Sequence, residues 1–239
     1  SLVGFAHPRT EHSKLSLRSS TAPALDGRFV SRRTLNIGTS TRRLRAMNPW
    51  IAKAVILAGM VVMVGIRAPH GARSRTVKVV KNRKGPLETV LLTLAWLGFF
   101  VPLIWIASPL LSFADYPLRM TTLLGGIALL VVGLWLLQRS HAHLGTNWSV
   151  TLQVRDHHRL VTDGVYQYVR HPMYTALFLY SLGQLLALPN WVAGPSYLVT
   201  FGILFALRVR AEERMMLEEF GPDYAAYMAR TKRLVPRVW

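Results

Sequence analysis

The chain has 239 residues, a formal net charge of +18 and 51% hydrophobic side chains. A soluble domain of this size would not combine so much apolar content with so many Lys and Arg. The sequence contains no Cys, which excludes disulfides, thiolate nucleophiles and zinc sites built on Cys. Because the basic residues stand beside apolar stretches, the expected anionic partner is a membrane surface with its lipids, not a nucleic acid.

The first 46 residues differ from everything that follows. They hold nine Lys or Arg against two acids, Glu11 and Asp26, and show no apolar periodicity. We expect residues 1–46 to form a disordered basic leader, because this composition cannot bury enough surface to fold. One interpretation is an organelle transit peptide. The interpretation that we favour is that the leader is not native and that Met47 is the functional start.

Five apolar segments follow and predict an all-α, polytopic membrane protein of about five transmembrane helices. The segments are 50–66, 87–111, 119–138, 173–188 and 191–207. The second and third are long enough to cross the hydrocarbon core, and the others are somewhat short. After the leader, we divide the chain into N-terminal transmembrane helices over 47–139 and a C-terminal region over 140–239 that contains two further spans.

The distribution of Lys and Arg predicts how the spans are oriented. The 67–86 loop carries seven basic residues, the 139–172 loop four and the chain after Leu207 seven, whereas the 112–118 loop carries none. We therefore expect the three basic stretches on the cytoplasmic side and the start of the first span outside. The basic leader would break this rule, which is a second reason to doubt that it is native.

The polar 139–172 loop is too long and too varied to be a plain connector. Near its end Pro172 suits the first turn of the fourth span, because its missing N–H would be unpaired there in any case. The free amides at this helix start, with Arg170 and His171 beside them, would form a site for a carboxylate. Alternatively, Arg170 is one more positive-inside residue and His171 a simple helix cap.

A second charged group stands where the fifth span ends. Arg208 and Glu212 are four residues apart, which allows an intrahelical salt bridge. The alternative is that Glu212 or Glu213 binds the amine or the ribose hydroxyls of a ligand. Beyond them, Gly221-Pro222 interrupts a charged, periodic stretch, which predicts a cytosolic or interfacial helical tail.

The histidines and glycines have simpler explanations. His141, His143, His157 and His158 match no zinc-ligand spacing, so no metal is expected. The glycines of the third span predict close helix packing rather than phosphate binding; they are Gly125, Gly126 and Gly133.

Several of these residues together form a familiar pattern. The run His158–Tyr166, followed by Arg170-His171-Pro172-Met173-Tyr174, resembles the signature of the isoprenylcysteine carboxyl methyltransferase family, whose wider group includes membrane phospholipid N-methyltransferases. Further matching positions are Asn190-Trp191, Glu212-Glu213, Phe220-Gly221, Tyr224, Tyr227 and Pro236. The resemblance covers about 140–236, and the first three spans match only in being apolar.

The resemblance implies a methyltransferase region in which a cytosolic loop and a C-terminal helical tail cover a pocket for S-adenosylmethionine. The cofactor-binding residues that it implies are His158, Leu160, Val161, Gly164, Tyr166, His171, Pro172, Tyr174, Glu212 and Glu213. The residues that it implies toward the acceptor, our candidate catalytic residues, are Arg170, Arg208, Asn190 and Tyr197. Ala176 departs from the pattern, because relatives often have glycine there.

The implied reaction is O-methylation of a carboxylate on a lipophilic, isoprenylcysteine-like acceptor, a small molecule or a prenylated chain that enters from the bilayer. It requires alignment of the reactants and exclusion of water, and no general base. Arg170 or Arg208 would orient the carboxylate by a bidentate contact. The active site would face the cytoplasm, in the plasma membrane of a bacterium or the endoplasmic reticulum of a eukaryote. The alternatives are a phospholipid (phosphatidylethanolamine-type) N-methyltransferase and a non-catalytic membrane scaffold.

Overall fold

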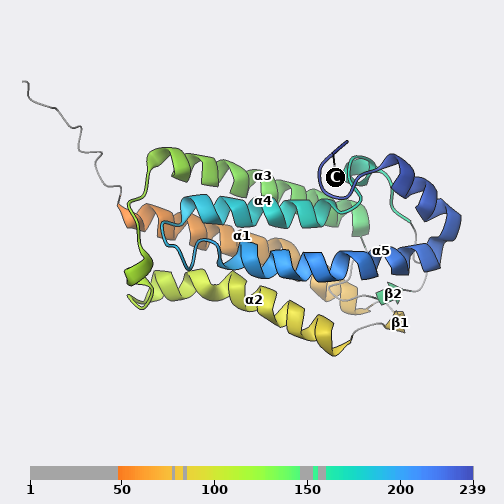
Figure 1. The fold of residues 1–239 in the computed structure, drawn as a ribbon, viewed down its shortest axis with the longest axis horizontal. Helices are drawn as coiled ribbons and strands as arrows, with labels where there is room; N and C mark the ends of the chain where they lie inside the picture. The colour runs from red at the N-terminus through yellow and green to blue at the C-terminus, as the bar shows by residue number, and fades with distance from the viewer. Residues whose placement is uncertain (1–47, 77–78, 83–84, 146–152, 156–159, 239) are drawn as a thin grey trace, which may run out of the picture. The chain divides into compact units, whose positions relative to one another are not determined.

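The computed structural model describes residues 48–76, 79–82, 85–145, 153–155 and 160–238. The expected leader over 1–46 and the candidate cofactor-binding residue His158 lie outside these residues. The helices are α1 (Pro49–Thr76), α2 (Pro86–Ala107), α3 (Met120–Leu144), α4 (Pro172–Ala187) and α5 (Ser196–Arg230), and Figure 1 shows them lying side by side. The all-α membrane architecture is confirmed: of the described helices, α1, α2 and α3 are long and apolar enough to cross a membrane.

Three helices extend beyond their apolar segments, and α3 does so as far as Leu144. α1 continues to Thr76, so part of the expected 67–86 loop is helical. α5 runs from the fifth apolar segment into the charged tail as far as Arg230, and its only non-helical residue is Gly221, with φ 50° and ψ −123°. Arg, Lys and Glu are good helix formers, so a helix can continue beyond the apolar stretch in which it begins. α4 has only 16 residues, or about 24 Å, less than a full hydrocarbon core.

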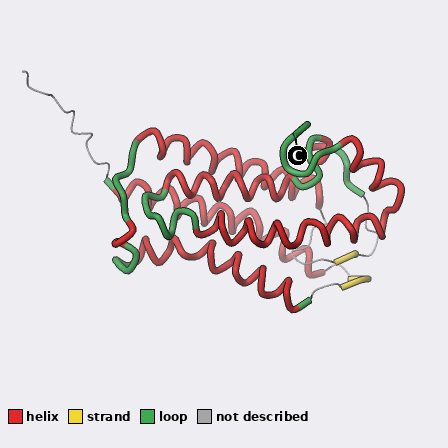
Figure 2. Tube along the Cα trace, in the orientation of Figure 1, coloured by secondary structure: helices red, strands yellow, loops and turns green. Residues whose placement is uncertain are grey.

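A two-stranded sheet was not predicted. β1 (Val79–Asn82) pairs antiparallel with β2 (Gln153–Arg155), and the pairing shifts between Val79 and Lys81. Figure 2 shows both strands at the end of the bundle where α1 stops and α2 starts. Neither segment has the alternating pattern of a half-buried strand, so only the contact between distant loops reveals the pairing.

α3 and α4 pack closely because of small residues. A Cβ on Gly126 would lie 2.7 Å from the Ala187 amide nitrogen, and one on Gly133 would lie 2.8 Å from the Tyr180 amide nitrogen. The predicted packing role of these two glycines is confirmed. A Cβ on Gly125 would make only an ordinary contact, at 3.8 Å.

Candidate functional site

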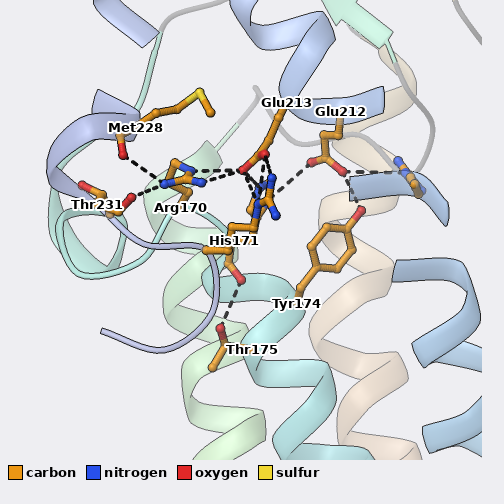
Figure 3. A network of polar contacts seen from close by, with 10 residues as sticks. Arg170, His171, Tyr174, Thr175, Glu212, Glu213, Met228 and Thr231 are labelled. Atoms are coloured by element: carbon orange, nitrogen blue, oxygen red, sulfur yellow. Dashed lines mark hydrogen bonds and ion pairs between the residues drawn. The ribbon is translucent and has the colours of Figure 1, made fainter. Parts of the chain in front are cut away.

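The site begins at the first turn of α4. Pro172 is the first residue of that helix, as predicted. His171 is the N-cap residue of α4, as one interpretation predicted, but its side chain makes no capping hydrogen bond. Its Nε2 instead lies 3.3 Å from Oε1 of Glu213 on α5. The signature at the start of α4 and the acidic pair on α5 are therefore in contact (Figure 3).

Glu213 is the centre of an ion-pair cluster. Arg170 donates to its Oε1 at 2.8 Å, and Arg233 donates to its Oε2 at 2.6 Å. Burial, which leaves 5% of the side chain exposed, would raise the pKa of the Glu213 carboxyl. Hydrogen bonds from His171, Arg233 and Arg170 outweigh this effect and lower the pKa well below its ordinary value. Glu213 is thus an ionised carboxylate, and both of its oxygens accept hydrogen bonds from arginines.

Arg170 fastens the end of the chain to α4. Its Nη1 donates to the carbonyls of Met228 and Thr231, and its Nε and Nη2 both donate to Glu213 (Figure 3). Its backbone N–H also donates to the Lys232 carbonyl at 2.7 Å. Since all three guanidinium nitrogens have partners within the protein, the geometry does not support our expectation that Arg170 orients an acceptor.

Glu212 differs from its neighbour in its surroundings. Its side chain is 27% exposed, and its Oε2 accepts a hydrogen bond from the Tyr174 hydroxyl at 2.5 Å. Its Oε1 lies 3.9 Å from Nδ1 of His171. The intrahelical pair with Arg208 also exists, at 3.8 Å between Nε and Oε2. Glu212 is the better candidate of the two acids for a ligand, because part of it remains accessible.

Arg208 has a partner that the sequence analysis missed. Its Nη2 lies 3.5 Å from Oε1 of Glu88, in the first turn of α2. The position of Glu88 at the edge of an apolar segment is the sequence signal for such a partner. An acidic side chain in a membrane costs free energy, so it usually has a buried partner. The ion pair of Arg233 with Glu213 is a second contact that the sequence does not reveal. The net charge of the tail alone does not indicate which acid each basic residue contacts.

The loop before α4 contributes mainly packing. Val161 and Tyr166 are buried, and Leu160 is half-buried. Gly164 has φ 58°, and a Cβ there would collide with the ring of His143, so a turn and a close approach explain this glycine. Of these four candidates, Tyr166 interacts electrostatically with Glu212, and the role of all four at a cofactor stays a prediction.

Two candidates lie away from the acidic pair. Asn190 is at the far end of α4, where its side-chain amide donates to the Leu111 carbonyl at 2.6 Å and to Asp115 at 2.7 Å. Its Oδ1 accepts from two amides of the next turn, so the Asn190 side chain organises the connection between α4 and α5. Tyr197 lies in the first turn of α5, with its ring 5.3 Å from that of Phe99.

Both contacting segments, at the start of α4 and on α5, lie within one match to a known protein family. Residues 126–218 match the family described as isoprenylcysteine carboxyl methyltransferase. The expected resemblance is therefore confirmed, and the family implies a methyl-donor cofactor.

Curated relatives named protein-S-isoprenylcysteine O-methyltransferase match less than half of this chain. Protein-S-isoprenylcysteine O-methyltransferase B of Arabidopsis thaliana is 31% identical over 115 residues, which are 47% of this chain and 58% of the relative. The human protein-S-isoprenylcysteine O-methyltransferase is 34% identical over 113 residues, 46% of this chain and 40% of the relative. The chain thus spans about half the length of the curated relatives that it matches.

A solved family structure is also similar. It is a eukaryotic intramembrane Ras methyltransferase, isoprenylcysteine carboxyl methyltransferase, with 26% identity and a TM-score of 0.43 over 66% of this chain and 55% of that chain. The family match includes Arg170, His171 and the acidic pair, whereas Glu88 and Arg233 lie outside it. The two contacts that the sequence did not reveal thus involve residues outside the family region.

Proposed function

We propose that this chain is an S-adenosylmethionine-dependent membrane methyltransferase that methylates a carboxylate on a lipophilic, isoprenylcysteine-like acceptor at the cytoplasmic face. The observation that carries the proposal is the contact between two parts of the family signature. His171 reaches Glu213 across 42 positions of sequence, and Tyr174 reaches Glu212 across 38. The membrane would be the plasma membrane of a bacterium or the endoplasmic reticulum of a eukaryote.

The residues beside α4 suit a methyl donor of this kind. S-adenosylmethionine, when bound, supplies an activated methyl group and carries an amine and ribose hydroxyls. Glu212 can accept hydrogen bonds from such groups, because one edge of it is exposed and Tyr174 fixes its Oε2. Val161 and Tyr166 offer buried apolar surface in the preceding loop, which helps to exclude water.

Arg208 is the better candidate to orient the acceptor. Its side chain is 9% exposed, and carboxylates lie near it on two sides, Glu88 at 3.5 Å and Glu212 at 3.8 Å. A guanidinium matches a carboxylate in a bidentate geometry. Since a carboxylate is already a nucleophile, these residues need only hold it in line with the methyl group and keep water out.

Methyl transfer by the full chain in detergent tests the proposal. With S-adenosylmethionine labelled in its methyl group, we expect label in a base-labile ester of a prenylated cysteine, and not in a fatty acid or an aminolipid. We expect Glu212→Gln to weaken donor binding by about tenfold in calorimetry, because a charged hydrogen-bond acceptor is lost. Glu219→Gln, an exposed acid on the same helix, is the matched control and should change little.

Two results would contradict the proposal. Label appearing in the aminolipid would assign the chain to N-methylation. An absence of donor binding by a folded, monodisperse sample would leave a non-catalytic membrane protein.

A further inference from the structure

The tail that follows α5 lies along the start of α4. Three successive carbonyls of the tail accept hydrogen bonds from this helix start: Lys232 from the Arg170 amide at 2.7 Å, Arg233 from the His171 amide at 3.0 Å, and Leu234 from the Thr175 hydroxyl at 2.9 Å. Leu234 is buried and packs with Phe205 and Val209 of α5. The tail therefore has a fixed register against the helix start that carries the family signature, although the family match itself ends at residue 218.

Arg233 holds both partners of the contact between His171 and Glu213. Its carbonyl accepts from the His171 amide, and its guanidinium donates to both oxygens of the Glu213 carboxylate. The distances are 3.1 Å from Nε to Oε1, 3.0 Å from Nε to Oε2 and 2.6 Å from Nη2 to Oε2. Arg170 and His171 contact Oε1. Because Arg233 also bonds Oε2, it fixes the plane of the carboxylate.

Charge pairing alone does not require this geometry. Arg170, whose Nη2 lies 2.8 Å from Oε1, already gives the buried Glu213 a counter-ion. The Arg233 side chain is 28% exposed, and ion pairs with access to water contribute little to stability. The fork of a guanidinium on a carboxylate does, however, fix the orientation of the acid. The arrangement therefore suits the positioning of Glu213 better than the stabilisation of the fold.

The orientation of Glu213 decides which ring nitrogen of His171 carries a hydrogen. An ionised carboxylate can only accept hydrogen bonds, so Nε2 of His171, 3.3 Å from Oε1, is the donor. Nδ1 of the same ring then lies 3.9 Å from Oε1 of Glu212, on the side that we assign to the methyl donor. Rotation of the Glu213 carboxylate would release Nε2, and the ring would no longer be held in one tautomer.

We propose that Arg233 is a positioning residue for methyl-donor binding: its guanidinium orients Glu213, and its carbonyl holds the His171 backbone. Together these contacts keep Nδ1 of His171 beside Glu212. The inference rests on the proposed function, which supplies the donor. It adds that the donor site is complete only when the tail lies on the start of α4. Arg233 acts through Glu213 and His171 and not by contact with the donor.

Donor affinity and the tautomer of His171 test this role in the full chain in detergent. We expect Arg233→Gln to weaken the binding of S-adenosylmethionine about tenfold in calorimetry. At alkaline pH and without donor, nitrogen NMR of histidine-labelled protein should show the hydrogen of His171 on Nε2 in the wild type and on either nitrogen in Arg233→Gln. The His171 signals are assigned by their loss in His171→Gln. A purely stabilising contact would lower the unfolding temperature and change neither readout.

Two further variants separate geometry from charge. Arg233→Lys keeps a positive charge beside Glu213 and should preserve the fold, but an ammonium group does not reproduce the fork of a guanidinium. We expect it to weaken donor binding about threefold. Lys232→Gln is the matched control, because it removes the neighbouring exposed charge and keeps the same backbone hydrogen bond. It should bind the donor as the wild type does.

Three results would overturn the role of Arg233. They are wild-type donor affinity in Arg233→Gln (or in Arg233→Lys, if the first variant does not fold), weakened binding with an unchanged His171 spectrum, and an equal loss of affinity in Lys232→Gln. Each of them leaves the proposed function intact as long as the wild type binds the donor. A folded wild type that binds no donor would instead contradict the proposed function, and the His171 spectra would still report whether Arg233 orients the ring.

Discussion

At the scale of single residues, the neighbours Glu212 and Glu213 have different surroundings. Successive residues of a helix point about 100° apart, so two adjacent acids on α5 face different partners. Glu213 is held by Arg170, His171 and Arg233, whereas Glu212 keeps an accessible edge beside Tyr174. The first holds the C-terminal tail in place, and the second is available to a ligand.

The cluster at Glu213 predicts a pH-dependent contribution to stability. We expect Glu213→Gln to remove about 3 kcal/mol or more, because it leaves Arg170 without its buried counter-ion. The pKa of Glu213 is lowered on folding, so its contribution is present above the unfolded value of about 4.3 and is lost as pH falls towards the folded value. Thermal unfolding in detergent, measured across this range, should show the difference.

The difference in unfolding temperature between wild type and Glu213→Gln should therefore be constant near neutral pH and shrink below about pH 4. Glu219→Gln, the exposed acid on the same helix, should match the wild type throughout. A difference that grows on acidification would contradict the assignment of Glu213 as an ionised member of the cluster.

At the scale of whole elements, α5 combines two segments that the sequence analysis treated separately. Its first part packs in the apolar core through Phe201 and Leu204, and its later part carries the acidic pair. Because the helix is continuous as far as Gly221, Arg208 and Glu212 have fixed positions relative to the core. The turn at Gly221, whose φ is 50°, then redirects the chain back towards α4.

The packing of α3 on α4 predicts an asymmetric effect of adding one methyl group. Gly133→Ala should destabilise the protein by about 1–3 kcal/mol, because its Cβ would meet backbone atoms of α4 at 2.8–2.9 Å, where nothing flexible can yield. Gly125→Ala, on the same helix with its nearest contact at 3.8 Å, is the control and should be tolerated. Unfolding temperatures in detergent compare the two. Equal effects would show that Gly133 does not set the helix separation.

At the scale of the whole membrane protein, successive helices run in opposite directions. The C-terminal ends of α1 and α3 and the N-terminal ends of α2 and α4 therefore meet at one end of the bundle (Figure 1). This end carries the site, and the distribution of basic residues predicts that it faces the cytoplasm. Asn190 and its partners Leu111 and Asp115 hold the connections at the other end.

The absence of Cys from the sequence allows a direct test of this topology. Ser112 and Lys232 are exposed. Ser112 follows the C-terminal end of α2, whereas the Lys232 carbonyl accepts from the Arg170 amide just before the N-terminal end of α4, at the opposite end of the bundle. In sealed, right-side-out vesicles, a membrane-impermeant maleimide should label Ser112→Cys and not Lys232→Cys until the vesicles are opened with detergent. Labelling of Lys232→Cys alone in the sealed vesicles would reverse the orientation and place the site outside.

The sequence by itself determined the main helices and the family resemblance. Apolar runs and helix-start signals such as Pro172 are local patterns, so they can be recognised without knowledge of the fold. The signature residues His171, Tyr174 and the acidic pair were identified for the same reason, since their spacing is written in the chain. Helix ends were less accurate, because the charged extensions of α1 and α5 carry no apolar period.

Only the tertiary structure decided what each charged side chain contacts. It placed Arg170 in contact with the tail and with Glu213, and it placed Glu88 beside Arg208 across 120 positions of sequence. It also moved Asn190 away from the acidic pair. An ion pair is defined by a distance of a few ångströms between groups on different helices, and the packing of those helices depends on side-chain shape along their whole length. No local pattern records that distance.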